Sequence, residues 1–254
     1  MLPILLDTAR NAGNAIMRIY EQPFEVAQKT DNSPLTAADL ASNQVIIEAL
    51  TQHFPHIPYI SEESKLTDYA IRKTWDSCWL IDPLDGTKEF VKRNGEFTVN
   101  IALIKNGLPI IGVIYVPVQQ TMYYAQYGQG SYKLQNGLVE KLSMQSIAAA
   151  TTVRIVASRS HLNAETADYI AQQQQQYGAV ELVSAGSSLK FCLIAEGKAH
   201  LYPRFAPTME WDTAAGHLIA TEAGAKIVQY PNINEALHYN KADLLNPYFL
   251  VSKA

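Results

Sequence analysis

The chain has 254 residues, of which 48% are hydrophobic and 17% are charged, and its formal net charge is −4. This is the composition of an ordinary soluble protein that is long enough to bury a large core in one or two domains. A weakly acidic chain has no strong positive field for a nucleic-acid polymer, although a local site in it can still bind a single nucleotide.

The first quarter of the chain predicts two helices. Residues 2–21 carry apolar side chains at helical spacing, and no basic start or cleavage site marks them as a secretory signal. A short strand is expected over 24–28. A second helix is expected over 36–54, where Thr36 and Asp39 form a start like a capping box and two prolines follow the end.

The middle of the chain predicts an antiparallel sheet. A short apolar strand over 78–81 runs directly into the string D-P-L-D-G-T. Strands over 97–104 and 110–116 flank an Asn-Gly pair, which is typical of a hairpin. Strands over 122–125 and 131–134 continue the meander, with glycine turns between them.

From about residue 150 the pattern alternates between strands and helices, which favours a partly parallel sheet. The expected strands are 153–157, 180–184, 199–202, 226–229 and 248–251, and the expected helices are 164–176, 187–196 and 211–223. No linker or internal repeat interrupts the chain. We therefore expect two tightly joined halves, 1–145 with the antiparallel sheet and most candidate ligands, and 146–254 completing a site between them.

The strongest functional feature is W-L-I-D-P-L-D-G-T, residues 79–87. Its proline restricts the backbone and its glycine permits a sharp turn, so Asp82 and Asp85 are expected on one rigid corner beside the Leu84 carbonyl. Hard cations such as Mg²⁺ prefer oxygen ligands of this kind. Two aspartates around a proline more often form a simple turn, but the complete string is far more specific.

The backbone N–H groups near Gly86 and Thr87 can hold a phosphate if a helix begins there. Further acids come from three separate segments: Glu62 and Glu63 in I-S-E-E-S, Asp212 in E-W-D-T-A-A-G, and Asp39 at the start of the second helix. Each also has a structural interpretation, as a loop charge, a first-turn acid or a helix cap. They form a metal site only if they converge on the aspartates of the D-P-L-D string.

These segments together resemble a known family. The chain resembles the lithium-sensitive inositol monophosphatase superfamily over nearly its whole length, through the motifs E-E-S, W-L-I-D-P-L-D-G-T and W-D-T-A-A-G. Within this superfamily, the chain is most similar to the 3′(2′),5′-bisphosphate nucleotidase branch of CysQ type, in the strings T-D-N-S-P-L-T-A-A-D, L-D-G-T-K-E-F, A-S-R-S-H and G-S-S-L-K-F-C. The resemblance implies an α/β (α+β) fold, built as a layered α-β-α-β-α sandwich.

The resemblance also implies two or three Mg²⁺ ions. Glu62, Asp82 and the Leu84 carbonyl would hold one, and Asp82, Asp85 and Asp212 a second, with a weaker third ion near Glu62. Four packed carboxylates repel one another and would not all stay ionised without cations, which agrees with this ligand set.

The same resemblance implies the catalytic roles. Glu62 and the Thr87 hydroxyl would orient the attacking water, with Asp39 accepting a hydrogen bond from Thr87. The substrate would be 3′-phosphoadenosine 5′-phosphate, converted to AMP and phosphate in sulfur assimilation, and the 5′-phosphosulfate analogue is a second candidate.

Two groups of residues are expected to contact this substrate. Those around the reacting phosphate are Glu62, Leu84, Asp85, Gly86, Thr87 and Asp212. Those expected at the second phosphate or the ribose are Ser187, Lys190 and Arg204, and His161 is expected only to contact the nucleotide. Lys190 is equally well interpreted as a surface lysine on a helix, and His161 as a structural histidine.

Two other functions remain open. An inositol or sugar monophosphatase would share every metal ligand, and only the substrate-side residues would differ. A non-catalytic protein that binds phosphorylated ligands has no need of a positioned water, so Thr87, Glu62 and Asp39 argue against it.

The location and partners are expected to be those of a cytoplasmic enzyme. Cys78 and Cys192 form no C-x-x-C pattern and are expected to be buried free thiols. The longest apolar stretch, 98–118, is interrupted by polar residues and prolines. We expect no obligate protein partner and no nucleic-acid polymer. Enzymes of the CysQ type can associate peripherally with the inner membrane, but no basic amphipathic helix supports this here.

Overall fold

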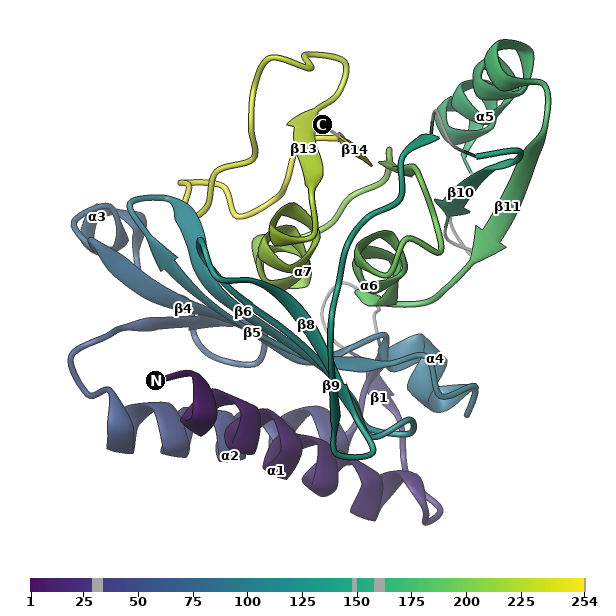
Figure 1. The fold of residues 1–254 in the computed structure, drawn as a ribbon. Helices are drawn as coiled ribbons and strands as arrows, with labels where there is room; N and C mark the ends of the chain where they lie inside the picture. Colours follow the sequence, from purple (N-terminus) through teal and green to yellow (C-terminus); the bar gives the residue numbers. More distant parts are fainter. Residues whose placement is uncertain (29–33, 148–149, 158–162, 254) are drawn as a thin grey trace.

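The structure, a computed structural model, describes residues 1–28, 34–147, 150–157 and 163–253. Its layers are visible in Figure 1, where the paired helices α1 (Leu2–Tyr20) and α2 (Ala37–His53) cover one face of a large sheet. Helices α6 (Leu189–Ala195) and α7 (Glu210–Glu222) cover the opposite face.

Both N-terminal helices are confirmed. Helix α1 buries an apolar stripe toward the sheet, and its Gly13 is needed because a Cβ there would lie 2.4 Å from the ring of Tyr115. Helix α2 begins as expected, because the Thr36 hydroxyl accepts the Ala38 N–H and the Asp39 carboxylate accepts the Thr36 N–H. The short strand expected over 24–28 is reduced to β1 (Ala27–Gln28), which pairs with β2 (Pro34–Leu35).

The central sheet has seven strands in the order β3-β4-β5-β6-β7-β8-β9. The strands are β3 (Tyr59–Ser61), β4 (Ser77–Asp85), β5 (Thr98–Lys105), β6 (Leu108–Val116), β7 (Thr121–Gln126), β8 (Gly130–Gln135) and β9 (Leu138–Lys141). Strands β3 and β4 are parallel, and every other pair is antiparallel. The Asn-Gly hairpin is confirmed, with φ of 50° at Asn106 and 78° at Gly107.

Two elements of this region were not predicted. Strand β9 is exposed along its whole length, so it has no apolar alternation to read. Helix α3 (Tyr69–Arg72) has four residues, too few to show a helical period.

Strand β4 differs from the expectation in a way that matters for the site. We expected the strand to end at Ile81, with the two aspartates on a turn after it, but β4 continues to Asp85. Asp82 lies opposite Asn100 and Asp85 opposite Thr98, so three steps on β4 match two on β5. This irregularity, at a proline that cannot donate to the ladder, places both aspartates on one face, whereas residues three apart on a regular strand face opposite ways.

The C-terminal part adds two smaller sheets. Strands β10 (Val153–Ala157) and β11 (Val180–Ser184) form a parallel pair, and β12 (Tyr202–Arg204), β14 (Phe249–Lys253) and β13 (Ala225–Gln229) form an antiparallel sheet in that order. The outer helix α5 (Ala164–Tyr177) contacts β11 and β12. The parallel expectation is therefore confirmed for one pair of strands in this region only.

Two elements begin later along the chain than predicted. Helix α6 begins after Ser187, whose φ of 42° is not helical. The strand expected over 199–202 begins only at Tyr202, because Leu201 makes an isolated bridge to Ile155 instead of joining the ladder.

The layers are therefore helices α1 and α2, the seven-stranded sheet, helices α6 and α7, the two small sheets, and helix α5. One buried cluster fills the space between α1, α2 and the central sheet, and a larger one fills the space around α6 and α7. Helix α7 approaches the sheet so closely that a Cβ at Gly112 would lie 2.6 Å from the Ala215 carbonyl oxygen. The layered α-β-α-β-α sandwich is confirmed. The boundary at residue 145 stays a prediction.

Candidate active site

A cavity of about 330 Å³ opens where strands β3 and β4 meet helix α4 (Thr87–Val91) and the starts of α6 and α7. Its wall includes these residues singled out from the sequence: Glu62, Asp82, Leu84, Asp85, Gly86, Thr87, Ser187, Lys190, Arg204 and Asp212. Asp39 is buried and does not line the cavity but accepts a hydrogen bond from the hydroxyl of Thr87, and His161 lies outside the described residues. Glu62, Asp82, Asp85 and Asp212 therefore meet in one pocket, whereas Asp39 is connected to it through the Thr87 hydroxyl.

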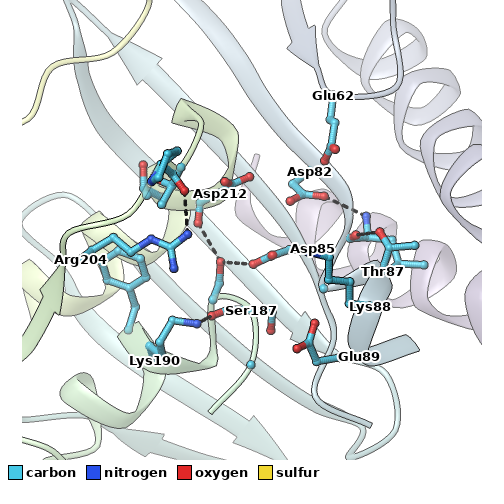
Figure 2. A pocket seen from close by; sticks show the side chains of 18 of the residues that line it. Glu62, Asp82, Asp85, Thr87, Lys88, Glu89, Ser187, Lys190, Arg204 and Asp212 are labelled. Atoms are coloured by element: carbon cyan, nitrogen blue, oxygen red, sulfur yellow. Dashed lines mark hydrogen bonds between the residues drawn. The ribbon is translucent and has the colours of Figure 1, made fainter. Parts of the chain in front are cut away.

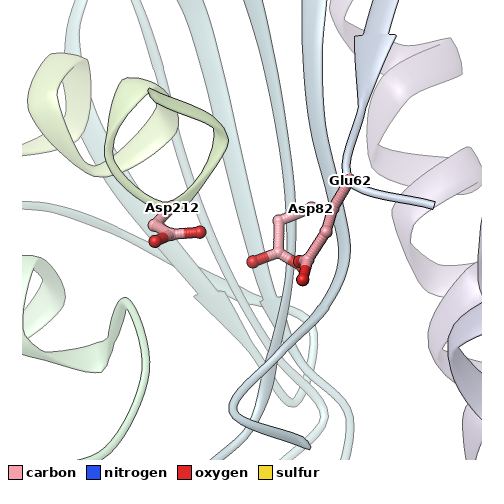
Figure 3. A group of neighbouring side chains, drawn as sticks. All are labelled: Glu62, Asp82 and Asp212. Carbon is pink, nitrogen blue, oxygen red and sulfur yellow. The ribbon is translucent and has the colours of Figure 1, made fainter. Parts of the chain in front are cut away.

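Three carboxylates form the centre of this pocket. Glu62 follows β3, Asp82 lies within β4, and Asp212 lies in the first turn of α7, yet one oxygen from each lies within 4.8 Å of the others (Figure 3). Asp85 lines the same cavity from the end of β4. Figure 2 shows Glu62, Asp82 and Asp85 on one side of a common space, with Asp212, Arg204 and Lys190 on the other.

Burial and like charge make this cluster costly to ionise. Desolvation, with the charges of Glu62 and Asp85, raises the pKa of Asp82 well above its usual value. The same causes, burial first and then Asp85 and Glu62, raise the pKa of Asp212 to about 8. Divalent cations would relieve this repulsion, and the donors are all oxygens, the ligands that Mg²⁺ prefers. The residues present therefore fit a hard metal ion.

Two of the acids also serve a helix start. Asp39 accepts the backbone N–H of Thr36 at 2.8 Å with Oδ2, and its Oδ1 accepts the Thr87 hydroxyl at 3.1 Å. Asp212 accepts the backbone N–H of Met209 at 2.9 Å with Oδ2. The capping and site interpretations of these acids are therefore compatible, because a cap uses one carboxylate oxygen and leaves the other.

The hydroxyl of Thr87 lies at the base of the pocket. Thr87 begins α4, directly after Gly86, whose φ of 92° few side chains tolerate. The same hydroxyl is 3.4 Å from the Leu84 carbonyl. A threonine hydroxyl has one proton, so when Asp39 accepts it, the oxygen lone pairs remain available to a water or ligand in the pocket.

Two basic side chains, Lys190 and Arg204, also line the cavity. Lys190 is only 5% exposed, so its interpretation as a surface lysine is wrong, and burial lowers its pKa to about 8. Its ammonium donates to the Ser187 carbonyl at 2.5 Å and lies over the Tyr202 ring. Arg204 donates to the Pro207 carbonyl at 2.8 Å. Within the described part of the chain, the Arg204 Nε and the Ser187 hydroxyl are buried without hydrogen-bond partners.

Sequence reasoning missed two polar residues beside this pocket. Asn100 and Ser188 are 1% and 2% exposed, and both contact Asp85. A lone asparagine inside the apolar run F-T-V-N-I-A-L-I was the available signal for the first, because buried polar side chains need partners. Ser188 lies in the string G-S-S-L-K-F-C that carried the family resemblance, but no local pattern assigned its side chain a role. Figure 2 also labels Lys88 and Glu89, which line the pocket from α4.

Comparison with known proteins agrees with this geometry. The sequence matches the inositol monophosphatase family over residues 1–251. The chain belongs to this family. The 3′(2′),5′-bisphosphate nucleotidase CysQ of Salmonella typhimurium is 48% identical over 255 residues, covering 99% of both chains. The protein of the same name from Escherichia coli K12 is also 48% identical, with the same coverage.

Solved structures of this family share the fold. The crystal structure of CysQ from Bacteroides thetaiotaomicron, described as a bacterial member of the inositol monophosphatase family, superposes with a TM-score of 0.88. It is 49% identical and covers 98% of this chain and 96% of its own. The suppressor protein suhB of Bartonella henselae has a TM-score of 0.81 at 22% identity, which shows the fold alone. The expected family and fold are confirmed.

Proposed function

We propose that this protein is a Mg²⁺-dependent 3′(2′),5′-bisphosphate nucleotidase. Its substrate would be 3′-phosphoadenosine 5′-phosphate, which it converts to AMP and phosphate, and the 5′-phosphosulfate analogue is a second candidate. The observation that carries the proposal is the meeting of Glu62, Asp82, Asp85 and Asp212 in one cavity that Lys190 and Arg204 also line. Full-length identity of 48% to proteins of that name supports the substrate class.

In this proposal the acidic wall holds two or three Mg²⁺ ions. Glu62, Asp82 and the Leu84 carbonyl form one ligand set, and Asp82, Asp85 and Asp212 form the other. When bound, the cations supply Lewis acidity toward the phosphate oxygens and the positive charge that offsets the carboxylates and the charge developing during displacement.

The protein's own groups would orient and deprotonate the attacking water. Asp39 holds the proton of the Thr87 hydroxyl, so the Thr87 oxygen can accept a hydrogen bond from water. The Glu62 carboxylate faces the same cavity and can accept the water's proton as the bond to phosphorus forms. A water held in this way attacks phosphorus directly as the bond from phosphorus to the ribose 3′ oxygen breaks. The 3′ oxygen takes up a proton, which Glu62 can return, and leaves as the hydroxyl of AMP, so no covalent phosphoenzyme is required.

The basic wall would select the nucleotide. A substrate with a second phosphate carries extra negative charge, and Lys190 and Arg204 supply positive charge in the cavity wall across from Glu62 and Asp82. The unpartnered hydroxyl of Ser187 supplies a donor there. We also propose that the protein works in the cytoplasm without a nucleic-acid polymer or obligate protein partner. In the described residues, no helix is long and apolar enough to cross a membrane.

The test is a substrate panel. Purified protein is incubated with 3′-phosphoadenosine 5′-phosphate, the phosphosulfate analogue and inositol 1-phosphate, each with Mg²⁺ or with EDTA, and released phosphate is measured. We expect Mg²⁺-dependent release with a clear preference for the bisphosphate nucleotide. A preference for inositol phosphate would assign the protein to the monophosphatases of the same family, and no turnover on any substrate would favour a binding protein.

A further inference from the structure

A chain of buried side-chain hydrogen bonds leads from the central sheet to Asp85. The Thr98 hydroxyl donates to Oδ1 of Asn100 at 3.0 Å, and Nδ2 of Asn100 donates to the Ser188 hydroxyl at 2.8 Å. The Ser188 hydroxyl lies 2.8 Å from Oδ2 of Asp85 and 2.8 Å from the backbone carbonyl of Asp212. All three polar residues of the chain, Thr98, Asn100 and Ser188, are at most 2% exposed.

Ser188 occupies a helix-capping position, but its hydroxyl does not cap the helix. Ser188 is the N-cap residue of α6, where a serine usually accepts a backbone N–H of the first turn. It makes no such side-chain bond here. Its hydroxyl instead contacts the carboxylate of Asp85 on β4 and the backbone carbonyl of Asp212 on α7. The Ser188 side chain therefore bonds to two positions of the site and not to the start of its own helix.

Asn100 fixes the direction of this contact. Because Thr98 donates to its carbonyl oxygen, the amide nitrogen faces Ser188, and it also lies 3.4 Å from Oδ2 of Asp85. With its oxygen accepting from Asn100, the Ser188 hydroxyl must aim its single proton at Asp85 or at the Asp212 carbonyl. Both contacts to Asp85 use Oδ2, which leaves Oδ1 for a cation.

We propose that Asn100 and Ser188 are positioning residues that hold the Asp85 carboxylate in its metal-binding orientation and thereby set the affinity of the site for Mg²⁺. The inference rests on the proposed function, because it assigns Asp85 to a metal. Hydrogen-bond partners of ligand carboxylates orient them, and their loss typically weakens metal binding about 10- to 100-fold. The Asn100–Ser188 hydrogen bond also joins the central sheet to the start of α6. It therefore fixes the relative position of these two elements beside Asp85.

The test measures metal binding directly. Wild type, Ser188→Ala, Asn100→Ala and the double variant are freed of metal, checked for folding by circular dichroism, and titrated with Mg²⁺ by calorimetry. Ser131→Ala is the matched control, since Ser131 is fully buried and, among the described residues, its hydroxyl has no partner. The Mg²⁺ concentration for half-maximal activity and the substrate KM at saturating Mg²⁺ are measured on the same proteins.

We expect each single variant to weaken the Mg²⁺ Kd about 10- to 100-fold, with the half-maximal Mg²⁺ concentration raised in parallel, KM little changed, and the control like wild type. The double variant should be no weaker than the worse single one, because the two residues act as one unit. A folded Ser188→Ala with a Kd within about twofold of wild type overturns the inference. If Ser188→Ala does not fold, Asn100→Ala decides by the same criterion. A wild type that binds no Mg²⁺ overturns the proposed function as well, whereas unchanged variants of a Mg²⁺-binding wild type overturn this inference alone.

Discussion

The hydroxyl of Thr87 lies 3.1 Å from Oδ1 of Asp39, although 48 residues separate the two along the chain. The other oxygen of Asp39 caps α2 by accepting the Thr36 N–H, so the start of that helix fixes the carboxylate that orients the Thr87 hydroxyl. Local helix chemistry and site chemistry therefore share one side chain.

This contact predicts how substitutions of Thr87 affect turnover. Thr87→Val keeps the shape but removes the hydroxyl, and it should lower kcat by about 10²- to 10⁴-fold, the usual contribution of positioned proton transfer. Thr87→Ser should retain most activity. Steady-state kinetics with saturating Mg²⁺ measures both, and the Mg²⁺ Kd of Thr87→Val should stay near that of wild type. A Thr87→Val enzyme with wild-type kcat would remove Thr87 from the mechanism.

Replacing Asp85 should separate activity from stability. Asp85 is among the charges that raise the pKa of both Asp82 and Asp212, so Asp85→Asn lowers the repulsion in the metal-free cluster. We expect turnover to be nearly abolished, while the melting temperature in EDTA is equal to or above that of wild type. Thermal melts with EDTA and with Mg²⁺ check this, because Mg²⁺ should stabilise the wild type more than the variant. Wild-type turnover in purified Asp85→Asn would show that the metal assignment is wrong.

The metal-free protein should lose stability as the pH rises. The pKa of Asp212 is raised from 3.8 to about 8 in the folded state, so between these values the folded protein binds more protons than the unfolded chain. The free energy of unfolding then falls with increasing pH across this range. Melting temperatures in EDTA from pH 5 to pH 8 should decline, and the stabilisation by Mg²⁺ should grow. In Asp212→Asn, residue 212 does not titrate, so the melting temperature in EDTA should decline less steeply with pH. An equally steep decline in that variant would show that the pH dependence comes from a group other than Asp212.

Lys190 should matter for the second phosphate and not for the reacting one. Lys190→Met keeps the apolar stem against Tyr202 but removes the charge, and we expect kcat/KM for the bisphosphate nucleotide to fall by about 10- to 100-fold, as for loss of one charge-assisted contact. The rate on a nucleoside 3′-monophosphate should change much less. Lys105→Met, at the exposed end of β5, is the matched control. An equal loss on both substrates would mean that Lys190 supports the fold of the pocket and does not select the substrate.

Much of the architecture could be predicted because its signals are local. The apolar stripe of α1, the capping start of α2 at Thr36 and the Asn-Gly hairpin each depend on residues within a few positions of one another. The string at 79–87 marked the site for the same reason, since the two aspartates and Thr87 are neighbours in sequence. The boundaries of α6 and β12 were less accurate, because a positive φ at Ser187 and an isolated bridge at Leu201 make both elements begin later than expected.

Only the tertiary structure decided what these residues meet. Spacing could name Glu62, Asp39 and Asp212 but could not bring them together, because each also had a complete local explanation as a loop charge or a helix start. The irregularity of β4 that turns Asp82 and Asp85 to one face depends on pairing with β5, and the burial of Lys190 depends on packing around α6. Asn100 and Ser188 are 88 positions apart, and no local pattern pairs them. Side-chain contacts over such separations arise only when the layers close, because it is burial that makes each polar group require a partner.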